Sequence, residues 1–161
     1  MNLTYGNIKK SKILKYIYLD LPENEYHSAL VRYEEELRHK FSENFVNLKS
    51  NFHDSKIEIK NNDNNITLVI SINKDEKKKV ILNFHNGRIV AWNKIKTNGH
   101  ISKLNKKVEI SEYGYEEFYE DKNINYVSII FFIKNRKTVN IGTYYPYLTI
   151  KYDNMEVIEI A

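Results

Sequence analysis

Hydrophobic residues recur every three or four positions between Glu25 and about Phe41. They are Tyr26, Ala29, Leu30, Tyr33, Leu37 and Phe41, and the charged residues of this segment fall mainly between them. This period predicts one N-terminal amphipathic helix that packs on a flat surface. Segment 12–19 is rich in β-branched and aromatic residues and precedes Pro22, so it predicts a strand before the helix.

The hydrophobic pattern changes to strict alternation after residue 55. Segments 56–60 and 66–72 alternate on either side of a polar cluster at 61–65, which predicts a hairpin. Polar residues between 42 and 51 lower helix propensity and predict that the helical region ends before Phe52.

Asn86-Gly87 is the strongest hairpin signal in the chain. It separates two apolar runs, 80–85 and 88–92, and a type I′ turn needs positive φ at both central residues. The sequence therefore predicts a hairpin that places Phe84 opposite Ile89.

The second half of the chain also predicts strands joined by short turns. It predicts a long strand at 125–133, a turn at Asn135-Arg136, a return strand at 137–144, and a final hairpin of 147–152 and 155–160 around Asp153-Asn154. The expected fold is a single α+β domain over 1–161, with the helix packed on a mostly antiparallel sheet of about eight or nine strands built from hairpins. An open sheet and a closed one both remain possible, as does a duplication of the two β-rich halves.

Composition removes several classes of chemistry. The 161 residues include no Cys, which excludes disulfides, thiol catalysis and thiolate zinc sites. Only 5 Gly and 2 Pro leave little material for glycine-rich phosphate loops. The histidines lack metal-site spacing, so we expect no cofactor and no metal.

The chain has no apolar stretch of roughly 18 residues, and its N-terminal segment has no uninterrupted apolar region. We therefore expect a cytoplasmic protein without membrane contact.

The net charge of +4 averages two opposed regions. Region 74–107 carries ten basic residues and two acids, Asp75 and Glu76; the basic residues are Lys74, Lys77, Lys78, Lys79, Arg88, Lys94, Lys96, Lys103, Lys106 and Lys107. Region 109–121 carries six acids and no base; the acids are Glu109, Glu112, Glu116, Glu117, Glu120 and Asp121.

Tyrosines alternate with the acids of the second region. Aromatic side chains supply contact area, and surrounding carboxylates attract a basic partner such as a nuclease. The candidate partner-binding residues are Glu112, Tyr113, Tyr115, Glu116, Glu117, Tyr119 and Glu120. The alternative is a short helix with Phe118 and one or two tyrosines in the core, and with solvated acids.

The tetrad Phe52-His53-Asp54-Ser55 contains the three residue types of a nucleophilic triad. Consecutive side chains of an extended chain point to opposite faces, so they do not form a relay among themselves. We expect a structural role, in which Phe52 anchors the chain and Asp54 or Ser55 bonds to backbone. A hydrolase centred on His53 and Asp54 is the enzymatic alternative.

The basic region offers a second alternative, a nucleic-acid-binding module. Its lysines would be Lys77, Lys78, Lys79, Lys94, Lys96, Lys103, Lys106 and Lys107, with Trp92 available for stacking. This alternative is disfavoured because Lys77 to Lys79 fall in a predicted hairpin loop and the predicted helix is rich in glutamate.

The tetrad, followed by the strands KIEI, ITLVISI and KVILNF and later by YLTIKYDNMEVIEI, resembles a loose group of small bacterial proteins of unknown function. Members of that group are often regarded as immunity proteins against toxins of Gram-positive bacteria. The resemblance covers about 52–95 and, more faintly, 125–160, and the helix at 24–41 has no counterpart in it. It implies a non-enzymatic protein that neutralises a toxin, with no catalytic residue to transfer.

Overall fold

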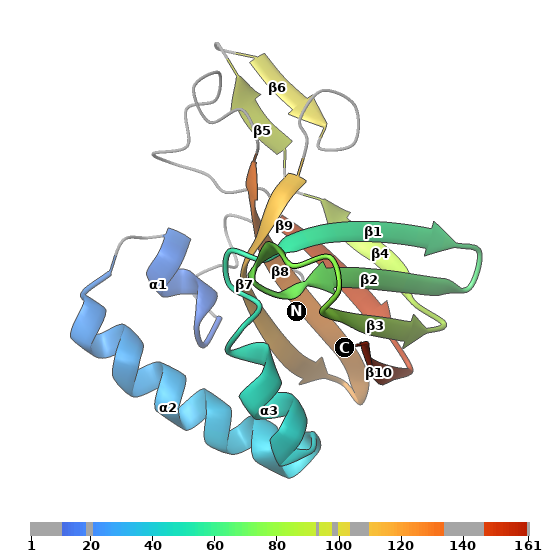
Figure 1. Ribbon diagram of the computed structural model, residues 1–161. Helices are drawn as coiled ribbons and strands as arrows, with labels where there is room; N and C mark the ends of the chain where they lie inside the picture. Colours follow the sequence, from blue (N-terminus) through green and yellow to red (C-terminus); the bar gives the residue numbers. More distant parts are fainter. Residues whose placement is uncertain are drawn as a thin grey trace.

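The computed structural model describes residues 11–18, 21–92, 94–97, 100–103, 110–133 and 147–160 (Figure 1). Three α-helices lie in this part of the chain: α1 (Leu14–Tyr18), α2 (Glu23–Lys40) and α3 (Glu43–Lys49). The predicted amphipathic helix corresponds to α2, and Ser42 caps α3 by accepting a hydrogen bond from the N–H of Phe45.

The strand predicted at 12–19 is wrong, because the described part of this segment forms α1. Two side-chain acceptors hold the start of this helix. Ser11 Oγ accepts from the N–H of Lys15 at 2.7 Å, and Glu117 Oε1 accepts from the N–H of Ile13 at 2.6 Å. Glu117 lies 104 residues from Ile13 along the chain, so the local sequence of segment 12–19 could not predict this contact.

The strands of the described residues form two sheets. One is two-stranded, β5 (Lys94–Thr97) with β6 (His100–Lys103). The other is an eight-stranded antiparallel sheet in the order β10-β3-β2-β1-β7-β8-β9-β4. Its strands are β1 (Lys56–Asn62), β2 (Asn65–Ser71), β3 (Lys79–His85), β4 (Arg88–Trp92), β7 (Ile110–Asp121), β8 (Ile124–Ile133), β9 (Tyr147–Tyr152) and β10 (Asn154–Ile160). The expected α+β class with a mostly antiparallel sheet is confirmed.

The first predicted hairpin, β1 with β2, is also confirmed. Its register places Ile57 opposite Ile70 and Ile59 opposite Leu68. These four side chains share one face, and the two on β2 are fully buried. A short 3₁₀ helix, η2 (Ile72–Lys74), then leads toward β3.

The hairpins predicted at Asn86-Gly87 and at Asp153-Asn154 are both wrong. Strand β3 pairs with β2 and β10, and β4 pairs with β9. Asn86 does have a positive φ of 53°, but the chain bends there without reversing. It bends again at Asp153, where the N–H of Asp153 donates to the carbonyl oxygen of His85 at 3.0 Å.

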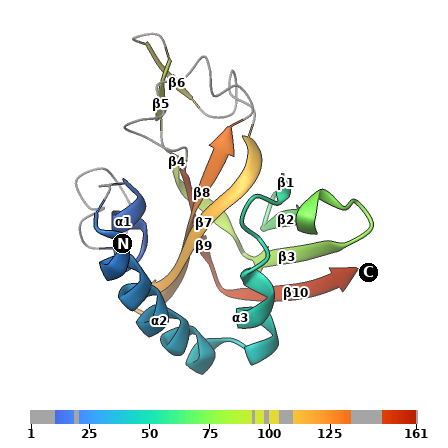
Figure 2. The same cartoon turned by 60° about the vertical axis from the view of Figure 1, so that its left-hand side comes forward.

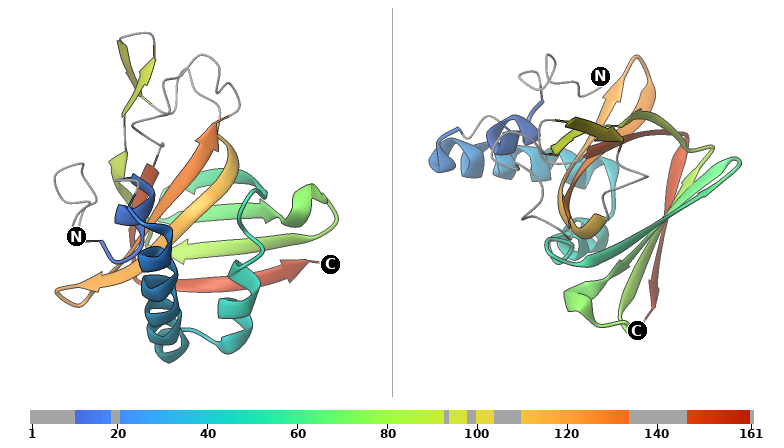
Figure 3. Two further views of the ribbon diagram at one scale, coloured as in Figure 1. Left: turned by 90° about the vertical axis from the view of Figure 1, so that its left-hand side faces the viewer. Right: turned by 90° about the horizontal axis from the view of Figure 1, so that it is seen from above.

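These two bends change the shape of the whole sheet. Strands β3 and β4 together pair with β10 and β9 as one long bent ribbon, so the sheet has two halves, β10-β3-β2-β1 and β7-β8-β9-β4. The halves meet a second time where Lys56 of β1 pairs with Glu112 of β7. The two halves are therefore joined at this pair and through the bent ribbon, and Figure 3 shows them inclined steeply to each other.

Aromatic side chains from helices and sheet meet in the core. The ring centroid of Phe118, on β7, lies 5.0 Å from that of Phe41 and 5.8 Å from that of Phe45. Ala29, Tyr33 and Leu37, the buried residues of α2, belong to the same cluster. In Figure 2, α1 and α2 lie beside β7, and α3 lies near β10.

The predicted turn at Asn135-Arg136 and return strand at 137–144 lie outside the described residues. No helix in the described part of the chain is long and apolar enough to cross a membrane.

Candidate functional site

The tetrad at 52–55 and the acidic segment, which the sequence offered as separate candidates, meet in the structure. The tetrad joins α3 to β1 and pairs with Tyr113 of β7. The N–H of Asp54 donates to the carbonyl oxygen of Tyr113, and the N–H of Tyr113 donates to that of Ser55, both at 2.8 Å. Phe52 is fully buried, with its ring centroid 5.4 Å from that of Tyr113.

The geometry of the tetrad does not assemble a catalytic triad. The Ser55 hydroxyl donates to the carbonyl oxygen of Asn51 at 2.8 Å and Ser55 is only 1% exposed. His53 lies at the surface, with Nδ1 3.6 Å from Asp54 Oδ1 and its ring centroid 4.8 Å from that of Tyr115. Phe52 is buried at the corner between α3 and β1, the Ser55 hydroxyl bonds to backbone, and Asp54 bonds to Tyr113 through its own N–H.

The described part of the acidic region, 110–121, is strand β7, so the short helix of the alternative is wrong, although Phe118 and Tyr113 are buried as that alternative expected. The strand pairs with β8 from Ile110 to Asp121 and has two irregularities, one of them between Tyr113 and Tyr115. Gly114 lies at that second irregularity, and a bulge re-aims the side chains that follow it. Alternation alone therefore does not say which acids face inward.

The seven candidate partner-binding residues do not form one exposed surface. Tyr113, Glu116 and Glu117 are buried, which removes them as contact residues. The other four are Glu112, Tyr115 and Tyr119, which are partly buried, and Glu120, which is exposed. The sequence of β7 did not reveal this division, because the buried acids are covered by α1, α2 and α3, which come from distant parts of the chain.

Glu116 belongs to an ion cluster that links α2, α3 and β7. Lys49 Nζ lies 3.9 Å from Glu116 Oε1, 3.8 Å from Glu34 Oε1 and 5.7 Å from the centroid of the Tyr33 ring. The Lys49 side chain is only 5% exposed. Burial raises the pKa of Glu116, and the charge of Lys49 opposes that rise. Burial also raises the pKa of Tyr26 to about 12.

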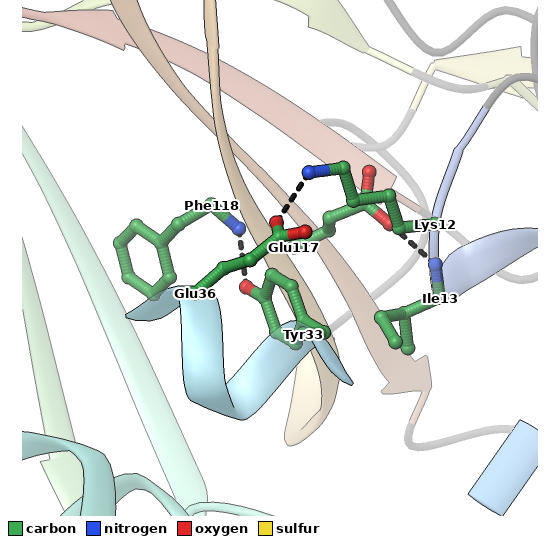
Figure 4. A network of polar contacts seen from close by, with 6 residues as sticks. All are labelled: Lys12, Ile13, Tyr33, Glu36, Glu117 and Phe118. Carbon is green, nitrogen blue, oxygen red and sulfur yellow. Dashed lines mark hydrogen bonds and ion pairs between the residues drawn. The ribbon is translucent and has the colours of Figure 1, made fainter. Parts of the chain in front are cut away.

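Glu117 occupies a second junction, shown in Figure 4. Its carboxylate faces the start of α1, where Oε1 accepts from the N–H of Ile13, and Oε2 is buried with no hydrogen-bond partner among the described residues. Burial raises the pKa of Glu117, while the backbone N–H groups of Ile13, Leu14 and Lys12 lower it. Beside it, Tyr33 Oη accepts from the N–H of Phe118 at 2.6 Å.

These contacts satisfy part of the edge of β7 that does not pair with β1. Among the described residues, β7 pairs with β1 only at Lys56 and Glu112, so the rest of that edge has no strand neighbour. Buried backbone donors require acceptors. The hydroxyl of Tyr33 supplies one, and α1 and α2 cover the edge that β1 leaves open.

A groove runs along α2 beside this junction. It contains two cavities, of about 390 Å³ and about 320 Å³. Both are lined by Lys12, Tyr33 and Glu36, and Lys12 Nζ forms an ion pair with Glu36. Four acids line the larger cavity, namely Glu36, Glu117, Glu120 and Asp121, against two lysines, Lys12 and Lys40.

The described part of the basic region is partly neutralised. Lys74 Nζ lies 2.9 Å from Glu112 Oε1 of β7. Lys77 and Lys78 are exposed in the connection from β2 to β3, the loop position expected from the sequence. Lys106 and Lys107 lie outside the described residues, and the side chains of Lys94, Lys96 and Lys103 are not described.

Within the described residues, no three His, Asp or Glu side chains are grouped as metal ligands. Comparison with protein-family models, with curated proteins and with solved structures found no match.

Proposed function

We propose that this chain is a non-enzymatic binding protein of the immunity type, and that its partner is a basic protein such as a nuclease toxin. One observation carries the proposal: four acids from α2 and β7 line the larger of the two cavities beside α2, which only two lysines line. Carboxylates gathered in a groove attract a basic protein and accelerate its association.

The contacts of the polar residues favour binding over catalysis. The Ser55 hydroxyl is committed to a backbone carbonyl oxygen, and Glu117 holds the start of α1. Burial raises the pKa of Tyr33, and its hydroxyl accepts from the N–H of Phe118. Each of these groups has a structural contact that a substrate would have to break.

The groove also offers the aromatic surface that binding sites use. Tyr119 is partly exposed and its ring stacks on Tyr126 of β8 with centroids 5.3 Å apart. Rigid aromatic side chains beside charged groups are typical of energetically important contacts. In this proposal Tyr119, Glu120 and Glu36 face the partner, and the protein acts in the cytoplasm, where it neutralises the toxin.

Co-expression with a toxin encoded beside its gene tests the proposal. We expect a stable complex and protection of growth, both weakened by Glu120→Lys because that change reverses a charge at the groove. Glu58→Lys is the matched control, since Glu58 is an exposed acid on β1 away from the groove. Absence of a complex and of protection would overturn the proposal.

A further inference from the structure

Strand β10 forms one end of the eight-stranded sheet. It pairs with β3, and no other strand of the described residues adjoins it. Every residue of β10 is partly buried or exposed, whereas Val80, Leu82 and Phe84 of the neighbouring β3 are buried. Figure 2 shows β10 as the outermost strand of its half of the sheet. An edge strand presents backbone groups with which a further strand can pair.

The register of the sheet identifies the backbone groups that point outward from β10. The N–H of Ile72 donates to the carbonyl oxygen of Lys78 at 2.9 Å, just beyond the pair of Ser71 and Lys79. In an antiparallel ladder this bond marks Ser71 and Lys79 as a pair without mutual hydrogen bonds, so the backbone of Lys79 points to β10. Alternation along the two strands then gives three residues whose N–H and C=O groups point away from β3, namely Met155, Val157 and Glu159.

The side chains of these three residues lie on the face of β10 that is turned to α3. Met155 and Val157 are partly buried against the core, and Glu159 Oε2 lies 3.5 Å from Asn44 Nδ2 of α3. A cavity of about 330 Å³ follows at the end of the strand, where Leu48 of α3 is one of its apolar walls. An added strand with apolar side chains on this face would cover Met155 and Val157 and place one side chain in the cavity.

Charge distinguishes β10 from the other open edges of the sheet. Strand β10 carries two acids and no base, whereas β4, at the opposite end of the sheet, carries Arg88 and no acid. Strand β1 pairs with β7 only at Lys56, and it carries two lysines against one glutamate. A basic segment therefore matches β10 better than it matches either of the other two edges.

The two acids of β10 differ in their surroundings. Lys78 and Lys79 line the cavity beside Glu159, so the charge of Glu159 is compensated. Glu156 is exposed, and its only ion-pair partner among the described residues is His85, with His85 Nε2 3.3 Å from Glu156 Oε2. A lysine or arginine on an added strand would complete the pairing of Glu156.

We propose that β10 receives an added antiparallel strand from a partner protein. The added strand is an extended segment with apolar side chains toward α3 and a lysine or arginine opposite Glu156. In this mode of recognition the main-chain hydrogen bonds supply affinity, and the side chains supply selectivity. The inference uses no residue of the groove along α2, so it goes beyond the proposed function.

The acids of β10 disfavour a second copy of this chain as the occupant. A two-fold antiparallel pair centred on residue 156 or 157 places Glu156 directly opposite or diagonally next to its own copy. A pair centred on residue 158 places Glu159 diagonally next to its copy. Like charges on neighbouring strands are destabilising, so the geometry favours a basic segment of another protein.

A peptide of the same length as β10 tests the proposal. The probe acetyl-Thr-Val-Lys-Val-Thr-Val-Thr-amide has its valines on one face and its lysine on the other, and a second peptide has glutamate in place of the lysine. We expect excess lysine peptide to slow amide hydrogen exchange about tenfold at Met155, Val157 and Glu159, measured by NMR. The amide of Ile158, which points to β3, should change little, and the glutamate peptide should protect less.

Charge reversal on two edges locates the binding strand. Glu156→Lys should weaken binding of the lysine peptide about tenfold and should strengthen binding of the glutamate peptide. Glu58→Lys is the matched control, since Glu58 is an exposed acid on the competing edge of β1, and it should leave both affinities unchanged. Both positions are exposed, so circular dichroism should show that both variants stay folded.

Three results would overturn the inference. They are unchanged exchange at the three outer amides, protection of β1 or β4 in place of β10, and a dimer of the chain that protects β10 without any peptide. A loss of peptide binding with Glu58→Lys would also assign the site to β1. The toxin experiment decides the proposed function separately, because neither peptide nor variant involves the groove.

Discussion

Asn86 Nδ2 donates a hydrogen bond to Asp153 Oδ2 at 2.7 Å, and this contact joins the two bends of the sheet. The residues lie 67 positions apart, at the points where β3 passes into β4 and β9 into β10. Because both strands bend at the same level, their pairing continues on either side of the corner. The two halves of the sheet are connected through this ribbon.

The bend requires Gly87, which gives the first prediction. A Cβ at this position would lie 2.7 Å from the carbonyl oxygen of Phe84 and 3.1 Å from its Cβ. Gly87→Ala should therefore lower the free energy of unfolding by about 1–3 kcal/mol, measured by urea denaturation. Asn61→Ala, at an exposed position of β1, serves as control. An unchanged urea midpoint for Gly87→Ala would show that the corner relaxes freely.

A matched pair of tyrosines tests the covered edge of β7. Tyr33→Phe leaves the buried N–H of Phe118 without its acceptor and should cost about 1–3 kcal/mol of unfolding free energy. Tyr152→Phe should be neutral or stabilising, because the Tyr152 hydroxyl is buried and has no hydrogen-bond partner in the part of the chain that the structure describes. Thermal unfolding of both variants measures the difference, and equal losses would contradict the assigned role of Tyr33.

Lys49 should be important for stability although it is a lysine. Lys49→Met leaves Glu34 and Glu116 close together without their shared cation, and we expect a loss of roughly 3 kcal/mol at neutral pH. Lys60→Met, at an exposed position of β1, should change stability little. Guanidinium denaturation compares the two, and a small loss at Lys49 would mean that water screens the cluster.

The raised pKa of Glu116 makes stability depend on pH. The folded protein holds this proton at pH values above the ordinary pKa of 4.5, where the unfolded chain has released it. Its contribution to stability therefore falls as pH rises from 4.5 through the raised pKa. Between pH 5 and pH 7.5, Glu116→Gln should lose less stability than the wild type with rising pH, because the amide has no proton to release.

Unfolding midpoints of the two proteins at matched ionic strength give this comparison. Glu159→Gln is the control, since Glu159 is an exposed acid of β10. Parallel pH profiles for wild type and Glu116→Gln would assign the pH dependence to other groups.

Local patterns in the sequence determined the elements that depend on near neighbours. The period of α2, the alternation of β1 and β2, and the positive φ at Asn86 follow from side-chain spacing and turn chemistry within a few residues. The hydrogen bond from Ser55 to Asn51 has the same local origin, because the two residues lie only four positions apart.

Tertiary structure decided which strands pair and which acids are buried. Positive φ at Asn86 is compatible with a hairpin and with a bend. The bend forms because β3 pairs with β10 and β4 pairs with β9. Glu116 and Glu120 are the same residue type on one strand, yet the first is buried beside Lys49 and the second is exposed. Burial depends on what packs from elsewhere in the chain, and the pattern of a single segment does not carry that information.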